Sequence, residues 1–150
     1  MDNIQSFEAL YVYALTAVVL CVNLIIIWTY SGAVRLKTKI AINPEDAERF
    51  KTKLEDLDPP EVARVLRAHA NAQASIIPFL ILGLVYVLIG GAASTAKIIF
   101  GIFTVARLLH SIVYLAGKQP WRTIFFGISS LALGALIVVT VIKICQGTFQ

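Results

Sequence analysis

The stretch that decides the fold is ALYVYALTAVVLCVNLIIIWTYSGAV, residues 9–34, which holds 26 residues without a formal charge between Glu8 and Arg35. As a helix it would be roughly 39 Å long at about 1.5 Å per residue, against a bilayer hydrocarbon core of about 30 Å. We therefore predict a transmembrane helix over about residues 8–34.

Three further apolar runs follow, and each is long enough to cross a bilayer. They predict helices over about 59–90, 95–117 and 121–145, with a loop over about 35–58. Asp58, Pro59 and Pro60 are typical of a helix N-terminus, with Asp58 as the capping residue. The expected fold is a single all-α domain over residues 1–150, an integral membrane four-helix bundle.

The composition supports a membrane protein and excludes several other classes. Of the 150 residues, 58% are hydrophobic and 15% are charged, which is too apolar for a soluble catalytic domain. Two cysteines are too few for a disulfide framework, and we expect Cys21 to be buried and unreactive. The net charge of +4 does not indicate a nucleic-acid partner, because the basic residues form no run. No residues have metal-ligand spacing, so we expect no metal site.

The distribution of Lys and Arg predicts the orientation in the membrane. Ten of them lie in residues 35–67 and 118–122, whereas only Lys97 and Lys143 lie near the opposite helix ends. Because loops rich in Lys and Arg stay in the cytoplasm, we expect the 35–67 loop there and the termini outside or in a lumen. The first helix lacks the features of a removable signal peptide.

Charged and polar side chains inside the apolar runs are the candidates for function, because a charge at the centre of a membrane helix costs at least about 2.5 kcal/mol. In two of the predicted helices such residues recur at helical spacing: Arg64, Arg67, Asn71 and Ser75 in one, and Arg107, His110, Ser111, Tyr114 and Lys118 in the other. Arg122 lies at the start of the last predicted helix. No acidic residue lies between Ala9 and Val34 or after Glu61, so nothing within the spans balances these arginines.

Two explanations of this pattern compete. In the first, the arginines near the helix ends and Lys118 anchor the bundle at the membrane surface, and Arg107 bonds backbone carbonyls or Asn23. In the second, the arginines converge on an anionic ligand, because guanidinium groups pair carboxylates bidentately. The excess of arginine over acid at one mouth of the bundle favours the second explanation and a small anion that carries several carboxylates.

Asp46 has a structural explanation as well as a chemical one. The segment 43–49, NPEDAER, predicts a short helix in the loop, with Asn43 as the N-cap and Pro44 at the first position. Acids in a first turn face the positive end of the helix dipole, which accounts for Asp46 without catalysis. A catalytic role is the alternative.

Several ordered motifs resemble the MAPEG family, the membrane-associated proteins of eicosanoid and glutathione metabolism, and most closely its microsomal prostaglandin E synthase branch. The motifs are GAVRL at 32–36, NPEDA at 43–47, RVLRAHAN at 64–71, PF at 78–79, RLLH at 107–110, YL at 114–115 and PWR at 120–122. The chain length and the four predicted helices also fit this family.

The resemblance implies a homotrimer that binds glutathione between subunits near the cytoplasmic face, with a lipophilic substrate entering from the membrane lipid. By match to the family's motifs, six residues would contact glutathione: Arg35, Arg67, Asn71, His110, Tyr114 and Arg122. Arg122 would hold the thiolate, Thr123 would assist the thiol, and Asp46 would shuttle a proton, so these three are the catalytic candidates.

The sequence also departs from the family. Ala63 and Ala74 stand where the family usually carries Glu, and the second of those acids is expected to engage the amino group of glutathione. Ala70 replaces an arginine of the prostaglandin branch, and Phe126 replaces an aromatic hydroxyl. Losing a charge-assisted hydrogen bond costs about 1.5–3 kcal/mol, which implies weaker glutathione binding or a related thiol in its place.

The resulting prediction is a glutathione-dependent membrane transferase, peroxidase or isomerase that acts on a lipophilic electrophile or peroxide by thiolate attack. The alternative is a noncatalytic lipid-binding or scaffold member of the same fold, which the three alanines favour. A small transporter fits less well, because the charged residues cluster at one membrane side without an acidic relay. The sequence does not name the lipophilic substrate or the membrane.

Overall fold

The structure, a computed structural model, describes residues 2–148 and the side chains of residues 7–147. Along the chain it contains α1 (Asp2–Thr38), β1 (Ile40–Ala41), α2 (Pro44–Phe50), β2 (Lys53–Leu54), α3 (Pro60–Leu88), α4 (Ala93–Leu115) and α5 (Trp121–Thr148). Within the described residues, α1, α3, α4 and α5 are long and apolar enough to cross a membrane. The predicted fold class, an all-α membrane four-helix bundle, is confirmed.

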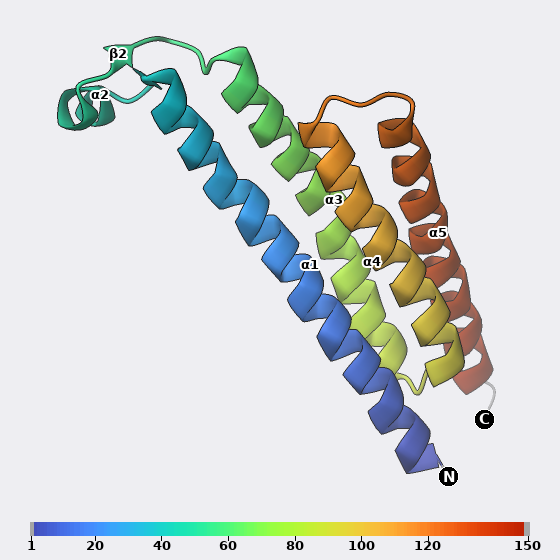
Figure 1. Ribbon diagram of the computed structural model, residues 1–150. Helices are drawn as coiled ribbons and strands as arrows, with labels where there is room; N and C mark the ends of the chain where they lie inside the picture. The colour runs from blue at the N-terminus through green and yellow to red at the C-terminus, as the bar shows by residue number, and fades with distance from the viewer. Residues whose placement is uncertain (1, 149–150) are drawn as a thin grey trace.

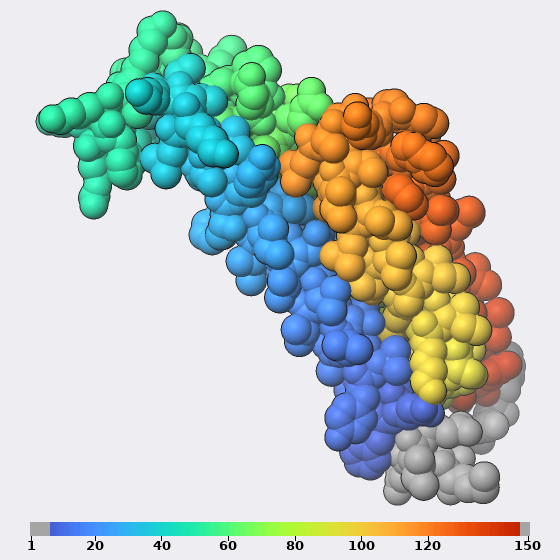
Figure 2. Space-filling model, viewed as in Figure 1, coloured from blue at the N-terminus to red at the C-terminus, as the bar shows by residue number. Residues whose placement is uncertain are grey.

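The four long helices run side by side (Figure 1), with α4 packed against α5 and α1 packed against both α3 and α4. The start of α1 and the end of α5 lie at one end of the bundle. The segment with β1, α2 and β2 lies at the opposite end, beside α1 and away from α5, and it projects beyond the bundle in Figure 2.

The loop after α1 is more ordered than the sequence indicates. β1 and β2 form a parallel pair with Ile40 opposite Lys53 and Ala41 opposite Leu54, and α2 connects them. The N–H of Lys53 donates to the carbonyl of Lys39 at 3.0 Å, and that of Glu55 donates to Ala41 at 2.9 Å. This pairing holds the projecting segment against the end of α1.

The first long helix ends four residues later than predicted, at Thr38 instead of 34, so Arg35 is helical and does not begin the loop. A charge marks where the chain leaves the hydrocarbon, but a helix can continue into water. Arg35 and Lys37 in the last turn face the negative end of the helix dipole, which favours that continuation. The turn ends at Lys39, whose φ of 54° is left-handed.

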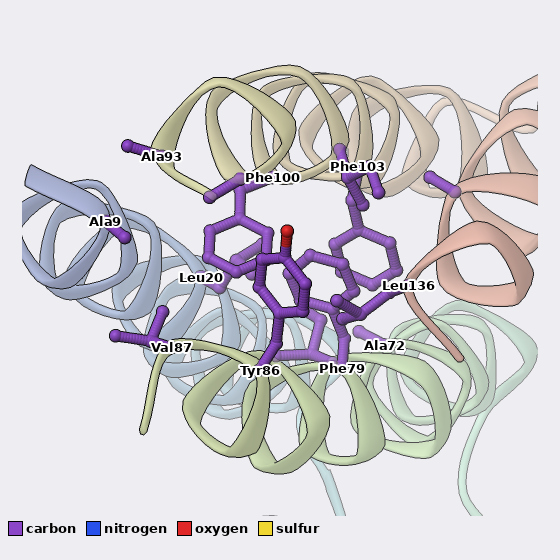
Figure 3. Close-up of a cluster of buried hydrophobic side chains, with 14 of the residues drawn as sticks. Ala9, Leu20, Ala72, Phe79, Tyr86, Val87, Ala93, Phe100, Phe103 and Leu136 are labelled. Atoms are coloured by element: carbon purple, nitrogen blue, oxygen red, sulfur yellow. The ribbon is translucent and has the colours of Figure 1, made fainter. Parts of the chain in front are cut away.

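An aromatic core fills the centre of the bundle. The ring of Phe79 stacks on Phe103 with centroids 3.6 Å apart and meets Phe100 edge-on at 5.4 Å. Figure 3 shows these rings between α3 and α4, with Leu20 and Leu136 beside them. On α4 the buried polar residues begin at Arg107, one turn beyond Phe103, so the packed core ends where the candidate site starts.

Asn43 is the N-cap residue of α2 with Pro44 at the first position, as predicted, although its side chain makes no capping hydrogen bond and donates from Nδ2 to Oδ2 of Asp46 at 3.0 Å. Two other local predictions were wrong. Asp58 does not cap α3, which begins at Pro60, because its carboxylate is bound to Arg35. Cys21 is exposed and not buried, because it lies on the outward face of α1, which an apolar run alone does not identify.

Candidate functional site

A cavity of about 230 Å³ at the turn end of the bundle brings together residues from three helices. Its lining residues are Asn71, His110, Tyr114, Arg122, Thr123 and Phe126. The first five are among the residues that the sequence predicts for the site, although they are up to 52 positions apart between Asn71 and Thr123. We refer to this space as the bundle cavity.

The turn between α4 and α5 places the reactive groups of this cavity. The amide of Gly117 donates to Tyr114 O at 3.1 Å, and that of Lys118 donates to Val113 O at 3.0 Å. Gly117 has a left-handed φ of 68°, which favours glycine, whereas the nearest atom to a Cβ there would be Nη1 of Arg64, the end of a flexible side chain that can move aside. The tight turn brings the start of α5 back to Tyr114.

Arg122 carries a charge that no described carboxylate balances. Its guanidinium carbon lies 4.9 Å from the centroid of the Tyr114 ring, which is a cation–π contact. Among the described side chains, the ion pairs within 4.0 Å involve other residues. A half-buried arginine without a carboxylate attracts an anion, and a thiolate is one.

Arg107 contacts two residues that line the cavity, Asn71 and Phe126, and is the largest fully buried side chain of the described chain, with 1% of its surface exposed. Its Nη1 donates to Oδ1 of Asn71 at 3.0 Å, and its guanidinium carbon lies 5.8 Å from the Phe103 ring and 5.6 Å from the Phe126 ring. Its Nε has no hydrogen-bond partner among the described residues. Arg107 thereby fixes Asn71, whose NH2 group is left to donate.

The predicted alternative partner of Arg107, Asn23, lies elsewhere in the same network. Nδ2 of Asn23 donates to Oγ of Ser111 at 3.1 Å, and that hydroxyl donates to the backbone carbonyl of Arg107 at 3.0 Å. Asn23, which the first explanation offered as one possible partner of Arg107, therefore does not bond its guanidinium among the described contacts. The rotation of α1 places Asn23 against Ser111, one turn further along α4, and helix rotation depends on packing between helices.

His110 joins the aromatic wall of the cavity. Its side chain is 2% exposed, and its ring meets Tyr114 edge-on with centroids 5.5 Å apart. A second contact, 6.2 Å between centroids, is with Phe126. These contacts orient the imidazole and place the Tyr114 ring beneath Arg122.

A second cavity, of about 240 Å³, lies under the loop and holds two other predicted residues, Arg35 and Asp46. We call it the loop cavity. Nη2 and Nε of Arg35 donate to Oδ1 of Asp58 at 2.7 and 3.1 Å, and Asp46 accepts from Asn43. Within one chain, Arg35 and Asp46 therefore line a different cavity from Arg122, and the charge of Arg35 is balanced.

The remaining predicted residue, Arg67, is exposed on α3 and lines neither cavity. It lies one helical turn from Asn71 toward the loop end of α3. Ala70 and Ala74 are exposed on the same helix. By the resemblance given above, Ala70 replaces an arginine of the prostaglandin branch and Ala74 replaces a glutamate of the family. This outward face of α3 is open in the single chain.

Sequence reasoning did not include one residue beside the cavity, Gln119. It lies in the turn before α5 and contacts the side chains of Arg122 and Thr123. Its spacing could have indicated this position, because Gln119 precedes Arg122 by three residues and Thr123 by four. Side chains at these spacings lie together when a turn continues into a helix.

Comparisons with known proteins agree with the motifs in the sequence. The sequence pattern described as the MAPEG family matches residues 13–142. The chain is 36% identical to prostaglandin E synthase of Equus caballus, covering 82% of this chain and 84% of the relative. It is 33% identical to the Homo sapiens protein of that name, with coverage of 89% and 88%, and 35% identical to microsomal glutathione S-transferase 1 of Homo sapiens, with coverage of 84% of each.

Proposed function

Because the chain belongs to the MAPEG family, we propose that it is a glutathione-dependent membrane enzyme, a transferase, peroxidase or isomerase for a lipophilic electrophile or peroxide. The observation that carries this proposal is the bundle cavity, in which an arginine with no carboxylate partner among the described side chains adjoins a hydroxyl, a phenol, an imidazole and an amide. These groups suit a thiol peptide.

Arg122 is the residue that would activate the thiol. A free thiol has a pKa of about 8.5, and a nearby guanidinium in a partly dry site favours the thiolate at neutral pH. The Tyr114 ring, 4.9 Å below the guanidinium carbon, fixes where that charge lies. The Thr123 hydroxyl lines the same cavity and would donate to the sulfur.

Bound glutathione would supply a thiolate nucleophile, and the thiol proton would pass to water. With an aryl halide, the S–C bond forms and the C–halogen bond breaks. The halide leaves with the electron pair of that bond. The chain's own part is to bind and orient. Asn71, held by Arg107, would bond the peptide backbone with His110 and Tyr114, and Arg35 and Arg67 would bind carboxylates.

The separation of the two cavities supports a site shared between copies of the chain, as in the homotrimer that the family resemblance implies. Ligand pockets are commonly about 300–1,000 Å³, so a cavity of about 230 Å³ holds only part of a tripeptide. Arg35, Asp46 and Arg67 lie outside it. We propose that the loop cavity of a neighbouring copy completes the site, which would bring its Arg35 and Asp46 to the bundle cavity, Asp46 as the proton shuttle.

The decisive experiment compares the purified protein with Arg122→Ala, Arg122→Lys and the distant control Lys143→Ala. Glutathione binding is measured by calorimetry, and conjugation of 1-chloro-2,4-dinitrobenzene by absorbance. We expect Arg122→Ala to lower kcat/KM by about 100-fold, as for the loss of one anion-stabilising donor, and Arg122→Lys to recover part of it. Lys143→Ala should match the wild type. A wild type that binds no thiol would overturn the proposal.

A mixing experiment tests whether two copies share a site. One variant is Arg122→Ala and the other is the double variant Arg35→Ala with Asp46→Asn; each is expected to be weakly active alone. Co-expressed at equal levels, they would form some sites with both halves intact, about a quarter of them for random mixing. Activity no greater than the mean of the two parents would argue against a shared site.

The same assays separate catalysis from the alternative function, a noncatalytic lipid-binding or scaffold protein. Three alanines favour that alternative, because they stand where the resemblance leads us to expect charged side chains: Ala63, Ala70 and Ala74. Glutathione binding without turnover of aryl halide, peroxide or endoperoxide would favour it. Turnover of the aryl halide without endoperoxide isomerisation would favour the transferase over the isomerase.

We also propose that the loop end of the bundle faces the cytoplasm and the helix ends near residues 2 and 148 face outside or a lumen. The ten Lys and Arg residues in segments 35–67 and 118–122 support this orientation. Protease accessibility of the 39–57 loop in sealed vesicles tests it: cleavage only after permeabilisation of right-side-out vesicles is the expected result.

A further inference from the structure

Gln119 lies between the two candidate catalytic residues of α5. One heavy atom of its side-chain amide is 3.1 Å from Oγ1 of Thr123, and the other is 2.8 Å from Nη2 and 3.1 Å from Nε of Arg122. The three residues are therefore in one hydrogen-bonded group, two members of which, Arg122 and Thr123, line the bundle cavity.

Hydrogen-bonding chemistry fixes the orientation of this amide. A guanidinium group only donates, so the amide atom that faces Arg122 is the carbonyl oxygen, which accepts from both Nη2 and Nε. The NH2 group then faces Thr123 and donates to its hydroxyl oxygen. In this orientation every contact pairs a donor with an acceptor.

The arrangement leaves two free groups on the cavity residues. Arg122 engages Nη2 and Nε with Gln119, so Nη1 is the part of the fork left for an anion. Because the Thr123 oxygen accepts from Gln119, its own O–H is free to donate. Held by Gln119 at one edge and by the Tyr114 ring at its face, the guanidinium has little freedom to rotate.

The backbone on either side of Gln119 is held as well. Lys118 N–H donates to Val113 O at 3.0 Å on the α4 side, and Thr123 N–H donates to Pro120 O at 3.0 Å on the α5 side. The amide therefore presents its two ends from a fixed position in the turn. Its neutral oxygen orients the guanidinium without neutralising it, which a carboxylate would do.

We infer that Gln119 is a positioning residue, which directs Nη1 of Arg122 and the hydroxyl proton of Thr123 toward one anionic sulfur. This inference rests on the proposed thiol chemistry of the bundle cavity. Gln119→Ala should release both groups. Gln119→Glu should keep the contact with Arg122 and balance its charge, but a carboxylate only accepts, so the Thr123 hydroxyl would then donate to it instead of to the sulfur. The first variant therefore tests orientation, and the second tests the charge of Arg122 together with the free proton of Thr123.

The test uses the full-length protein in micelles, with Gln146→Ala near the opposite end of α5 as a matched control. The thiolate absorbance of added glutathione is titrated against pH, and kcat and KM are measured with the aryl halide. For Gln119→Ala we expect kcat to fall about 10-fold with little change in KM, as for one lost hydrogen bond to a charged group. For Gln119→Glu we expect the thiolate midpoint to rise by about one pH unit.

A second readout does not depend on turnover. Phenylglyoxal modifies accessible arginines, and mass spectrometry reports each site, so Gln119→Ala should speed modification of Arg122 several-fold relative to Arg64. Unchanged labelling and an unchanged pH profile, in a wild type that forms thiolate, would overturn the role of Gln119 alone. A wild type without thiolate signal would overturn the thiol function together with it, even if labelling changes.

Discussion

The bundle cavity and the loop cavity are nearly equal in volume, about 230 and 240 Å³, and each is lined by an arginine. In the loop cavity, Arg35 donates twice to Asp58. In the bundle cavity, Arg122 contacts the Tyr114 ring and no described carboxylate. The positive charge of the arginine is therefore balanced by a carboxylate in the loop cavity, and no described carboxylate balances it in the bundle cavity.

This difference shows that charge balance, and not cavity size, distinguishes a candidate anion site. A guanidinium paired with a carboxylate is already satisfied, so an incoming anion has to displace Asp58 before it gains from Arg35. Arg122 requires no such displacement. Arg107 is a third case, because it is fully buried and uses one donor to hold Asn71.

The largest expected effect separates the buried arginine from the paired one. Arg107→Ala removes a side chain that is 1% exposed and should lower the free energy of unfolding by about 3 kcal/mol or more. Arg35→Ala removes an ion pair whose side chains are 30% and 14% exposed, so its loss should be about 1 kcal/mol or less.

Denaturant or thermal unfolding in one detergent measures both variants. Arg107→Met is the control, since it keeps most of the volume without the charge and should recover most of the stability. Equal losses for Arg107→Ala and Arg35→Ala would remove the distinction between the two regions.

The second effect concerns the reactive end of the bundle cavity. Thr123→Val keeps the shape of the side chain and removes its hydroxyl, so kcat should fall about 10-fold while glutathione affinity changes little. Thr38→Val, at the end of α1 outside both cavities, is the matched control. Steady-state kinetics check the result, and a fall in affinity without a fall in kcat would assign Thr123 to binding only.

A smaller effect is expected from adding a hydroxyl to each cavity. Phe126→Tyr supplies the aromatic hydroxyl that the resemblance to the prostaglandin E synthase branch led us to expect, and one new neutral hydrogen bond should strengthen glutathione binding about 3-fold. Phe50→Tyr makes the same change in the loop cavity, which the proposed neighbouring copy brings to the site, so a gain no larger than that of Phe126→Tyr is expected there. Phe7→Tyr, exposed near the opposite end of α1, is the matched control and should leave binding unchanged. Calorimetry compares the three variants, and a gain at Phe50 that exceeds the gain at Phe126 would contradict the bundle cavity as the main binding site.

The smallest effect is the release of Arg35. Asp58→Asn removes the carboxylate that balances it and keeps a side chain of the same size, so glutathione affinity should rise about 2-fold to 3-fold at low salt. High salt should reduce the gain. Affinity that falls or stays constant would show that Arg35 does not bind the ligand and serves only to hold the loop.

The sequence predicts the class of the molecule well because the relevant physics is local. An apolar run of sufficient length has one stable location, the bilayer, and its backbone groups require a helix there. The run at residues 9–34 thus identifies a membrane span without knowledge of its neighbours, and the ordered motifs identify the family. Helix ends are less certain, as α1 shows by continuing past Arg35.

Contacts between polar side chains were decided only by the tertiary structure. Which face of a helix turns inward depends on how helices pack, and this rotation paired Arg107 with Asn71 instead of Asn23 and left Cys21 exposed. Asp58 lies 23 positions from Arg35, and the ordered loop brings them together. Composition and spacing determined that charges gather at one end of the bundle; the packing of distant segments decided which of those charges is satisfied.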